Sequence, residues 1–238
     1  KYEGKILRFN LTPDQDTSMS DSWIPDNNPF TTPDKQSAVW SFGHRNPQGL
    51  AFGNGILYEA EHGPYSDDEI NIVVPGKNYG FPLVAGFDDG NYNGAAVGAG
   101  SGVPLITDEH ANAIALGARY QDPIMSFFPA PNSMVTTIFG NDDNNTPPYP
   151  NYYLSWPTIA PAGLDFYHSD AIPGWQNSLL VTSLKLAKVF RLKLSPDGMS
   201  VVGDTVSYFN GLGRFRDIAI SPDGQKIYVA CDSVGQIA

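Results

Sequence analysis

The sequence is poor in cysteine, in basic residues and in long apolar runs. Cys231 is the single cysteine of 238 residues, which excludes an internal disulfide, a thiolate metal cluster and a Cys-x-x-Cys redox motif. Only 14 Lys and Arg stand against 25 Asp and Glu, and the net charge of −11 argues against a general nucleic-acid binder or a lipid-surface binder. No apolar run reaches the ~18 residues of a membrane-spanning helix, so none is predicted.

Glycine and proline are abundant instead, with 24 and 20 residues. Short runs of alternating apolar and polar residues lie between them, and no window of about a dozen residues keeps a helical period. Asn54-Gly55 predicts a type I′ hairpin, because both central residues of that turn need positive φ. The sequence therefore predicts an all-β chain with strands in residues 5–11, 50–53, 56–58, 69–74, 134–139, 178–181, 187–194, 216–220 and 226–230.

An internal repeat indicates how these strands are arranged. Residues 5–14 match residues 188–197 in character, and Ser-Pro-Asp-Gly at 195–198 recurs at 221–224. A strand that ends in such a turn and recurs along the chain is typical of propeller blades, although Pro-Asp-Gly is also a common turn. Residues 12–38 and 86–112 carry no strand pattern, which favours binding loops or disordered segments.

The few basic residues have an informative placement. Arg214 and Arg216 share one face if their segment is extended, while Arg45 follows Gly43-His44 in a loop and Lys185 lies in another turn. Together they could clamp a planar ligand that carries several carboxylates, since arginine pairs with carboxylates in a bidentate manner. The alternative is surface arginines paired with nearby aspartates, and the residues alone leave both interpretations open.

Carboxylates gather in residues 61–69 and at Asp88-Asp89, among Gly-Pro turns. Carboxylate and main-chain carbonyl oxygens suit Ca²⁺, although the spacing is not that of an EF-hand and such a loop can also simply be solvated. The four histidines lack zinc-site spacing. The aromatic residues are expected in the core, among them Trp40, Phe52, Tyr58 and Trp156.

Several motifs, in order along nearly the whole chain, resemble the soluble quinoprotein glucose dehydrogenases and the related aldose sugar dehydrogenases. The motifs are Gly-His-Arg-Asn-Pro-Gln-Gly-Leu at 43–50, Glu-His-Gly-Pro at 61–64, Asp-Asp-Glu-Ile-Asn at 67–71, Asn-Tyr-Gly-Phe-Pro at 78–82, Trp-Pro-Thr-Ile-Ala-Pro at 156–161, Ser-Leu-Lys at 183–185 and Gly-Arg-Phe-Arg-Asp at 213–217. The resemblance implies a six-bladed β-propeller that binds pyrroloquinoline quinone (PQQ) and Ca²⁺ and oxidises the C1 hydroxyl of an aldose sugar.

The resemblance also implies roles for individual residues. Arg45 would be catalytic and would contact the quinone oxygens together with Asn46, and the remaining cofactor-binding residues would be Tyr153, Thr158, Lys185, Arg214 and Arg216. Gly63 and Pro64 would offer main-chain carbonyls to the Ca²⁺ beside PQQ. A second, structural Ca²⁺ would be bound by Glu69, Tyr79, Asp89 and Glu109, the last being the loosest match.

The chain departs from the family in length. Family members are considerably longer. In the family, the base that takes the proton from the sugar hydroxyl is a histidine on a segment that precedes the first motif found here. We therefore expect residues 1–238 to form a single but incomplete propeller domain of about four blades, the portion that binds PQQ and calcium. The resemblance further implies an external electron acceptor, a periplasmic or secreted location and compatibility with a homodimer. A non-catalytic extracellular binding protein and a metal-dependent lactonase-type hydrolase on the same propeller stay open as alternatives.

Overall fold

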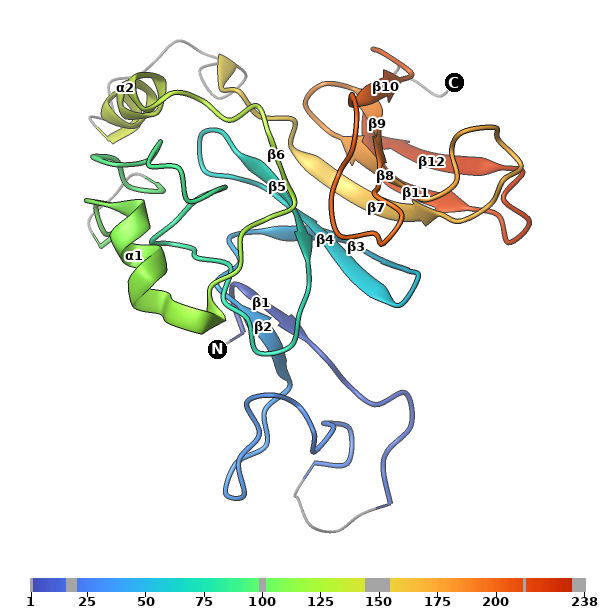
Figure 1. Ribbon diagram of the computed structural model, residues 1–238, viewed down its shortest axis with the longest axis horizontal. Helices are drawn as coiled ribbons and strands as arrows, with labels where there is room; N and C mark the ends of the chain where they lie inside the picture. The colour runs from blue at the N-terminus through green and yellow to red at the C-terminus, as the bar shows by residue number, and fades with distance from the viewer. Residues whose placement is uncertain (1, 16–20, 99–101, 144–154, 212, 233–238) are drawn as a thin grey trace.

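The computed structural model describes residues 2–15, 21–98, 102–143, 155–211 and 213–232 (Figure 1). Its strands are β1 (Lys5–Leu7), β2 (Val39–Phe42), β3 (Pro47–Gly53), β4 (Ile56–Glu61), β5 (Asp68–Ile72), β6 (Met125–Phe127), β7 (Pro161–Tyr167), β8 (Ser178–Ser183), β9 (Lys188–Lys193), β10 (Val206–Tyr208), β11 (Arg214–Ile220) and β12 (Ile227–Asp232). The helices are α1 (Glu109–Leu116) and α2 (Asn132–Asp143), and a 3₁₀ turn follows α1 at Gly117–Arg119.

Within these described ranges the strands form four antiparallel sheets. Two of them, β3–β4–β5–β6 and β7–β8–β9–β10, are four-stranded meanders, whereas β1–β2 and β11–β12 are pairs. A four-stranded antiparallel meander is the unit of a propeller blade. The predicted all-β, incomplete propeller of about four blades is confirmed. The single-domain boundary stays a prediction. In the same ranges, no helix has the length and apolar character needed to cross a bilayer.

The first strands of successive sheets lie next to one another, β3 beside β7 and β7 beside β11 (Figure 1). Their backbones approach closely at two glycines. An added Cβ would lie 2.7 Å from Ala162 O at Gly49, and 2.6 Å from Asp217 Cα at Gly163. Apolar side chains fill the space between the two larger sheets, with Tyr58, Ile70, Phe127, Leu164, Phe166, Leu179 and Phe190 all buried. Glycine therefore sets the spacing between neighbouring sheets.

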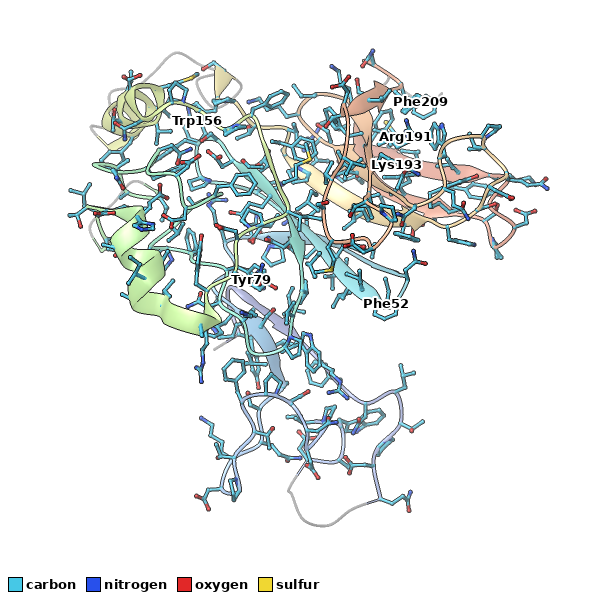
Figure 2. All side chains as sticks on the ribbon, in the orientation of Figure 1. Phe52, Tyr79, Trp156, Arg191, Lys193 and Phe209 are labelled. Carbon is cyan, nitrogen blue, oxygen red and sulfur yellow. The ribbon has the colours of Figure 1, made fainter. Side chains whose placement is uncertain are left out.

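The hairpin predicted at Asn54-Gly55 is confirmed. The two residues have φ of 52° and 83° and connect β3 to β4. The predicted core position of Phe52 is wrong, because the ring is 72% exposed on β3 (Figure 2). Side chains alternate along a strand, and in β3 the inward positions belong to Gly49, Ala51 and Gly53. Tyr58, by contrast, is fully buried.

The strand predicted for residues 134–139 is wrong, since these residues lie in α2. Their β-branched and aromatic side chains favour a strand by composition. Val135, Ile138 and Phe139, however, have the spacing of one helix face, and they pack against the cluster around Tyr65. Packing of that face therefore outweighs local propensity. Helix α1 was also not predicted, because eight residues are too few for a clear helical period.

The glycine spacing between sheets generates a stability prediction. Gly163→Ala places a methyl group 2.6 Å from Asp217 Cα and 2.9 Å from Ile218 N, both main-chain atoms of β11. Because the two strands must move apart, we predict a loss of about 1–3 kcal/mol in the free energy of unfolding, measured by urea denaturation. Gly98→Ala is the matched control, since among the described residues, its chain neighbours aside, no atom lies within 4 Å of the added Cβ. Equal stability of the two variants would contradict the close approach of β7 and β11.

Candidate functional site

A cavity of about 570 Å³ opens where one end of three neighbouring sheets meets. It lies at the starts of β3, β5, β7 and β11 and at the ends of β4 and β8, which share one edge because the sheets are antiparallel. The lining residues are Arg45, His62, Gly63, Pro64, Asp68, Trp156, Thr158, Ala160, Leu184, Lys185 and Arg214. Its volume is in the range of small-molecule sites.

The cavity brings together six of the residues predicted from the sequence. These are Arg45, Gly63, Pro64, Thr158, Lys185 and Arg214. Asn46 does not line the cavity; it is exposed, and its side-chain oxygen accepts a hydrogen bond from Gln48 Nε2 at 2.9 Å. Arg216 lies outside the lining as well. Tyr153 falls outside the described residues.

Lys185 is anchored against the wall of the cavity. Its Nζ donates to the main-chain oxygen of Trp156 and, at 3.0 Å, to Thr158 Oγ1. Burial lowers the pKa of this ammonium group, because desolvation disfavours the charged form. The ammonium group therefore lies partly out of water at the cavity, where it would interact more strongly with an anionic ligand than an exposed lysine would.

Arg214 and Arg216 extend from β11 toward the same partner. Arg214 Nε lies 3.7 Å from Asp232 Oδ1, and Arg216 Nε donates to Asp232 Oδ2 at 2.5 Å. The prediction that both guanidinium groups share one face of a strand agrees with this arrangement. About half of each side chain is exposed, so the two ion pairs are screened by solvent. Arg214 lines the cavity, and its contact with Asp232 is the longer of the two.

Asp68 joins two walls of the cavity through main-chain hydrogen bonds. Its Oδ1 accepts from Gly63 N at 2.9 Å, and its Oδ2 accepts from Ile159 N at 2.5 Å and Ala160 N at 2.9 Å. Burial raises the pKa of this carboxyl, although the three donors counteract the shift. The turn at Gly63 and the segment before β7 are thus held together by one buried side chain.

A second group of carboxyls surrounds the main chain of Ala85 and Gly86. Glu69 accepts from Gly86 N at 2.8 Å and Glu109 from Ala85 N at 3.0 Å. Asp67 is fully buried, and a Cβ at Gly86 would lie 2.7 Å from its Cβ. Burial raises the pKa of Asp67 to about 6 and that of Glu109 to about 7, and it raises that of Glu69 well above its usual range.

The other two predicted ligands of that group behave differently. Asp89 is exposed, and its negative charge contributes to the raised pKa values of Asp67 and Glu109, which places it near both. Tyr79 is buried, but its hydroxyl donates to Ile72 O and accepts from Val74 N at 2.9 Å. The ring stacks on His44 with centroids 4.3 Å apart. The structure therefore does not bring the Tyr79 hydroxyl to the carboxyls at Gly86.

Trp156, His62 and Asp67 belong to these sites but were not predicted as site residues. Trp156 (labelled in Figure 2) was expected in the core but is half-buried at the cavity. Its ring meets that of Tyr65 edge-on, with the ring centroids 4.9 Å apart. His62 Nε2 donates to the main-chain oxygen of Pro161 at 2.8 Å. Asp67 has φ of 61°, which is uncommon for a residue with a side chain. The signal in the sequence was that all three belong to the motifs at 61–64, 67–71 and 156–161.

Comparisons with known proteins show which family the chain belongs to. The sequence profile of the Glucose / Sorbosone dehydrogenase family matches residues 2–111 and 104–238. Quinoprotein glucose dehydrogenase B from Acinetobacter calcoaceticus is 37% identical over 99% of this chain and 49% of its own length. Aldose sugar dehydrogenase YliI from Escherichia coli K12 is 30% identical over 100% of this chain and 50% of its own length.

A solved structure supports the same relationship. A crystal structure of a glucose dehydrogenase superposes with a TM-score of 0.62 at 26% identity, covering 95% of this chain and 51% of that chain. The chain thus spans about half the length of the curated relatives it matches. Because the family profile matches nearly every residue, this chain belongs to the Glucose / Sorbosone dehydrogenase family.

Proposed function

We propose that this chain is the cofactor-binding portion of a PQQ-dependent sugar dehydrogenase that oxidises the C1 hydroxyl of an aldose to the lactone. The observation that carries the proposal is the convergence of Arg45, Lys185 and Arg214 on one cavity in a chain with a net charge of −11. Three cations around one cavity suit a ligand with several carboxylates. The name of the Acinetobacter relative, a quinoprotein, supports a quinone as that ligand.

The residues at the cavity fit the cofactor, which would supply an acceptor for a hydride from the sugar. Lys185 and Arg214 would attract its carboxylates. Arg45 would stabilise negative charge that develops on a quinone oxygen, a contribution of several kcal/mol in a partly water-excluded site. Trp156 would exclude water from one side. Asn46, Tyr153, Thr158 and Arg216 remain proposed contacts.

Calcium fits two places. Gly63 and Pro64 line the cavity, where their main-chain carbonyls would bind the ion that accompanies the cofactor. At Ala85–Gly86, Asp67, Glu69 and Glu109 converge, and no lysine or arginine forms a described ion pair with them. Several buried carboxyls without a cation form the donor set that Ca²⁺ prefers. Asp89 and the main-chain carbonyl of Tyr79 would complete the second site.

The cation cluster also distinguishes this proposal from its two alternatives. A binding protein without redox chemistry has no need for Arg45 beside two further cations. A lactonase-type hydrolase would use the carboxylates and a metal but leave the basic side chains without a role.

An external electron acceptor would reoxidise the cofactor. A periplasmic or secreted location and a homodimer stay predictions.

The first functional prediction concerns the cations of the cavity. In the complete protein loaded with PQQ and Ca²⁺, sugar-dependent reduction of a dye should be measurable. Arg45→Ala should lower kcat by about 100-fold, because it removes charge stabilisation in the transition state. Lys185→Ala should instead raise the Kd for PQQ by about 10-fold or more, measured by fluorescence titration, because a charge-assisted contact is lost.

Lys226→Ala is the matched control for Lys185→Ala, since Lys226 is exposed in the turn between β11 and β12 and does not line the cavity. It should leave both quantities within about twofold of the wild-type values. Wild-type protein that binds PQQ without reducing the dye would favour the binding-protein alternative. Lactone hydrolysis without dye reduction would favour the hydrolase.

The second functional prediction concerns calcium and pH. The folded pKa values of Asp67 and Glu109, about 6 and about 7, exceed their unfolded values, so their contribution to stability is fully present below about pH 4 and is lost as pH rises to about 7. In EDTA the melting temperature should therefore fall between pH 5 and pH 8. Added Ca²⁺ should raise it, and raise it more at pH 8, because ionised carboxylates bind the ion.

Glu109→Gln should reduce the stabilisation by Ca²⁺ at pH 8, while Glu3→Gln, at an exposed carboxylate with no described contact with these carboxyls, should not. A melting temperature that responds equally to Ca²⁺ at pH 5 and pH 8 would contradict binding at these carboxyls.

A further inference from the structure

Glu61 ends strand β4 directly beneath the loop that carries Arg45. The side chain is only 2% exposed. Its Oε2 accepts from the main-chain N–H of Arg45 at 2.6 Å and from that of Asn46 at 3.0 Å. Its Oε1 lies 3.1 Å from Asn71 Nδ2 and 3.3 Å from His44 Nδ1. Two main-chain amides, the Asn71 side chain and the His44 ring thus surround one carboxylate.

The main chain of residues 44–46 makes few other described hydrogen bonds to the main chain of other segments. His44 N donates to Gly4 O at 3.2 Å, and His62 N donates to Asn46 O at 3.3 Å. Both distances exceed those from the two amides to Glu61 Oε2. The Glu61 contacts are charge-assisted as well, and such hydrogen bonds are roughly twice as strong as neutral ones. Glu61 is therefore the strongest described restraint on the main chain at Arg45.

The Arg45 side chain depends on that restraint. Its guanidinium has one described hydrogen bond, from Nη1 to His62 O at 3.3 Å, and the described ion pairs do not include it. A long side chain without a carboxylate partner takes its direction from its own main chain. Any rotation of the peptide at Arg45 would displace the guanidinium from the cavity.

We propose that Glu61 is a positioning residue that aims Arg45 into the cavity by holding the main-chain amides of Arg45 and Asn46. This inference rests on the proposed function, in which Arg45 acts on the bound cofactor. Glu61 itself does not line the cavity, so it acts through Arg45 and does not touch the ligand. Its role requires a carboxylate, which can accept hydrogen bonds on both oxygens.

An amide at this position cannot meet the same requirement. A glutamine offers one acceptor and one donor group. Its NH₂ would face either the two main-chain N–H groups of Arg45 and Asn46, or the Asn71 amide and the His44 ring. Glu61→Gln thus conserves size while it replaces charge-assisted hydrogen bonds to the loop amides with weaker neutral ones, and it should loosen the loop without emptying the core.

Glu59 supplies a matched control on the same strand face. It is fully buried, its Oε2 accepts from Asn71 Nδ2 at 3.0 Å and lies 3.9 Å from His44 Nδ1, and it has no described contact with the amides of Arg45 and Asn46. Burial and the charge of Glu61 raise the pKa of Glu59 well above its usual range. Glu59→Gln keeps the size of the side chain and leaves the contacts of Glu61 with the loop amides in place, so it should change the loop little.

Amide hydrogen exchange tests the restraint without any cofactor. In the complete protein, Glu61→Gln should accelerate exchange at Arg45 and Asn46 by at least 10-fold, measured by mass spectrometry with fragmentation to single amides. Glu59→Gln should leave both rates within twofold of wild type. Unchanged exchange in Glu61→Gln would overturn the proposal. Equal acceleration in both variants would also overturn it. That result would mean that His44, Glu59 and Glu61 support the loop together, as they would if they bound a metal ion.

A double-mutant comparison tests the action through Arg45. Glu61→Gln should lower kcat at least 10-fold in the wild-type and Lys185→Ala backgrounds, and less than twofold in the Arg45→Ala background, where nothing is left to position. If Glu61→Gln lowers kcat as much in the Arg45→Ala background as in the wild type, the inference is overturned while the proposed function stays intact. A wild-type protein that binds PQQ in Ca²⁺ but lacks dehydrogenase activity would instead overturn the proposed function, and the role of Glu61 in catalysis with it.

Discussion

Buried carboxylates that accept main-chain hydrogen bonds determine the shape of the cavity. Asp68 ties the turn at Gly63 to Ile159 and Ala160, and Glu61 holds the loop at Arg45. Each of these carboxylates stands at the end of a strand, where the sheet no longer satisfies the main chain. Because an ionised carboxylate offers several acceptor sites, one side chain can organise two or three loop amides that would otherwise need water.

The structure also shows where some of the abundant acidic residues are placed. Several of the acidic side chains lie inside the protein: Asp67, Glu69 and Glu109 around Ala85–Gly86, and Glu59 and Glu61 beneath the cavity. Desolvation makes such charges costly unless they bind protons, amides or a cation. The scarce cations, by contrast, are placed where a ligand can reach them. This separation of charge is what the composition alone could not reveal.

Much of the fold could be predicted from local patterns. The hairpin at Asn54-Gly55 and the repeated strand-turn units depend on turn residues whose backbone preferences are local. Helix α2 could not be predicted in this way. Packing of its apolar face against the cluster around Tyr65 stabilises the helix, and the local propensity of its residues does not. Phe52 shows the same limit. Its outward position follows from Gly49 and Gly53 approaching β7, a contact made far along the chain.

The site was predicted mainly through its motifs, and the structure separates their members. Lys185 and Arg214 reach the cavity, whereas Asn46 lies outside its lining and the Tyr79 hydroxyl is engaged by the main chain of residues 72 and 74. A motif identifies neighbours in sequence but not which of them face the ligand. Glu61 and Asp68 lie in the carboxylate-rich motifs, but their roles in holding loops were not predicted, because the loop partners are main-chain amides, which the amino-acid sequence does not reveal.

The central claim is that Arg45, Lys185 and Arg214 face one anionic, planar ligand. A crystal structure of the complete protein with PQQ and Ca²⁺ tests it most directly. The account predicts planar density in the cavity, with the guanidinium groups of Arg45 and Arg214 and the Lys185 ammonium group all within hydrogen-bonding distance of its oxygens. Density for the cofactor elsewhere, or in the cavity but out of reach of these three groups, would contradict the account.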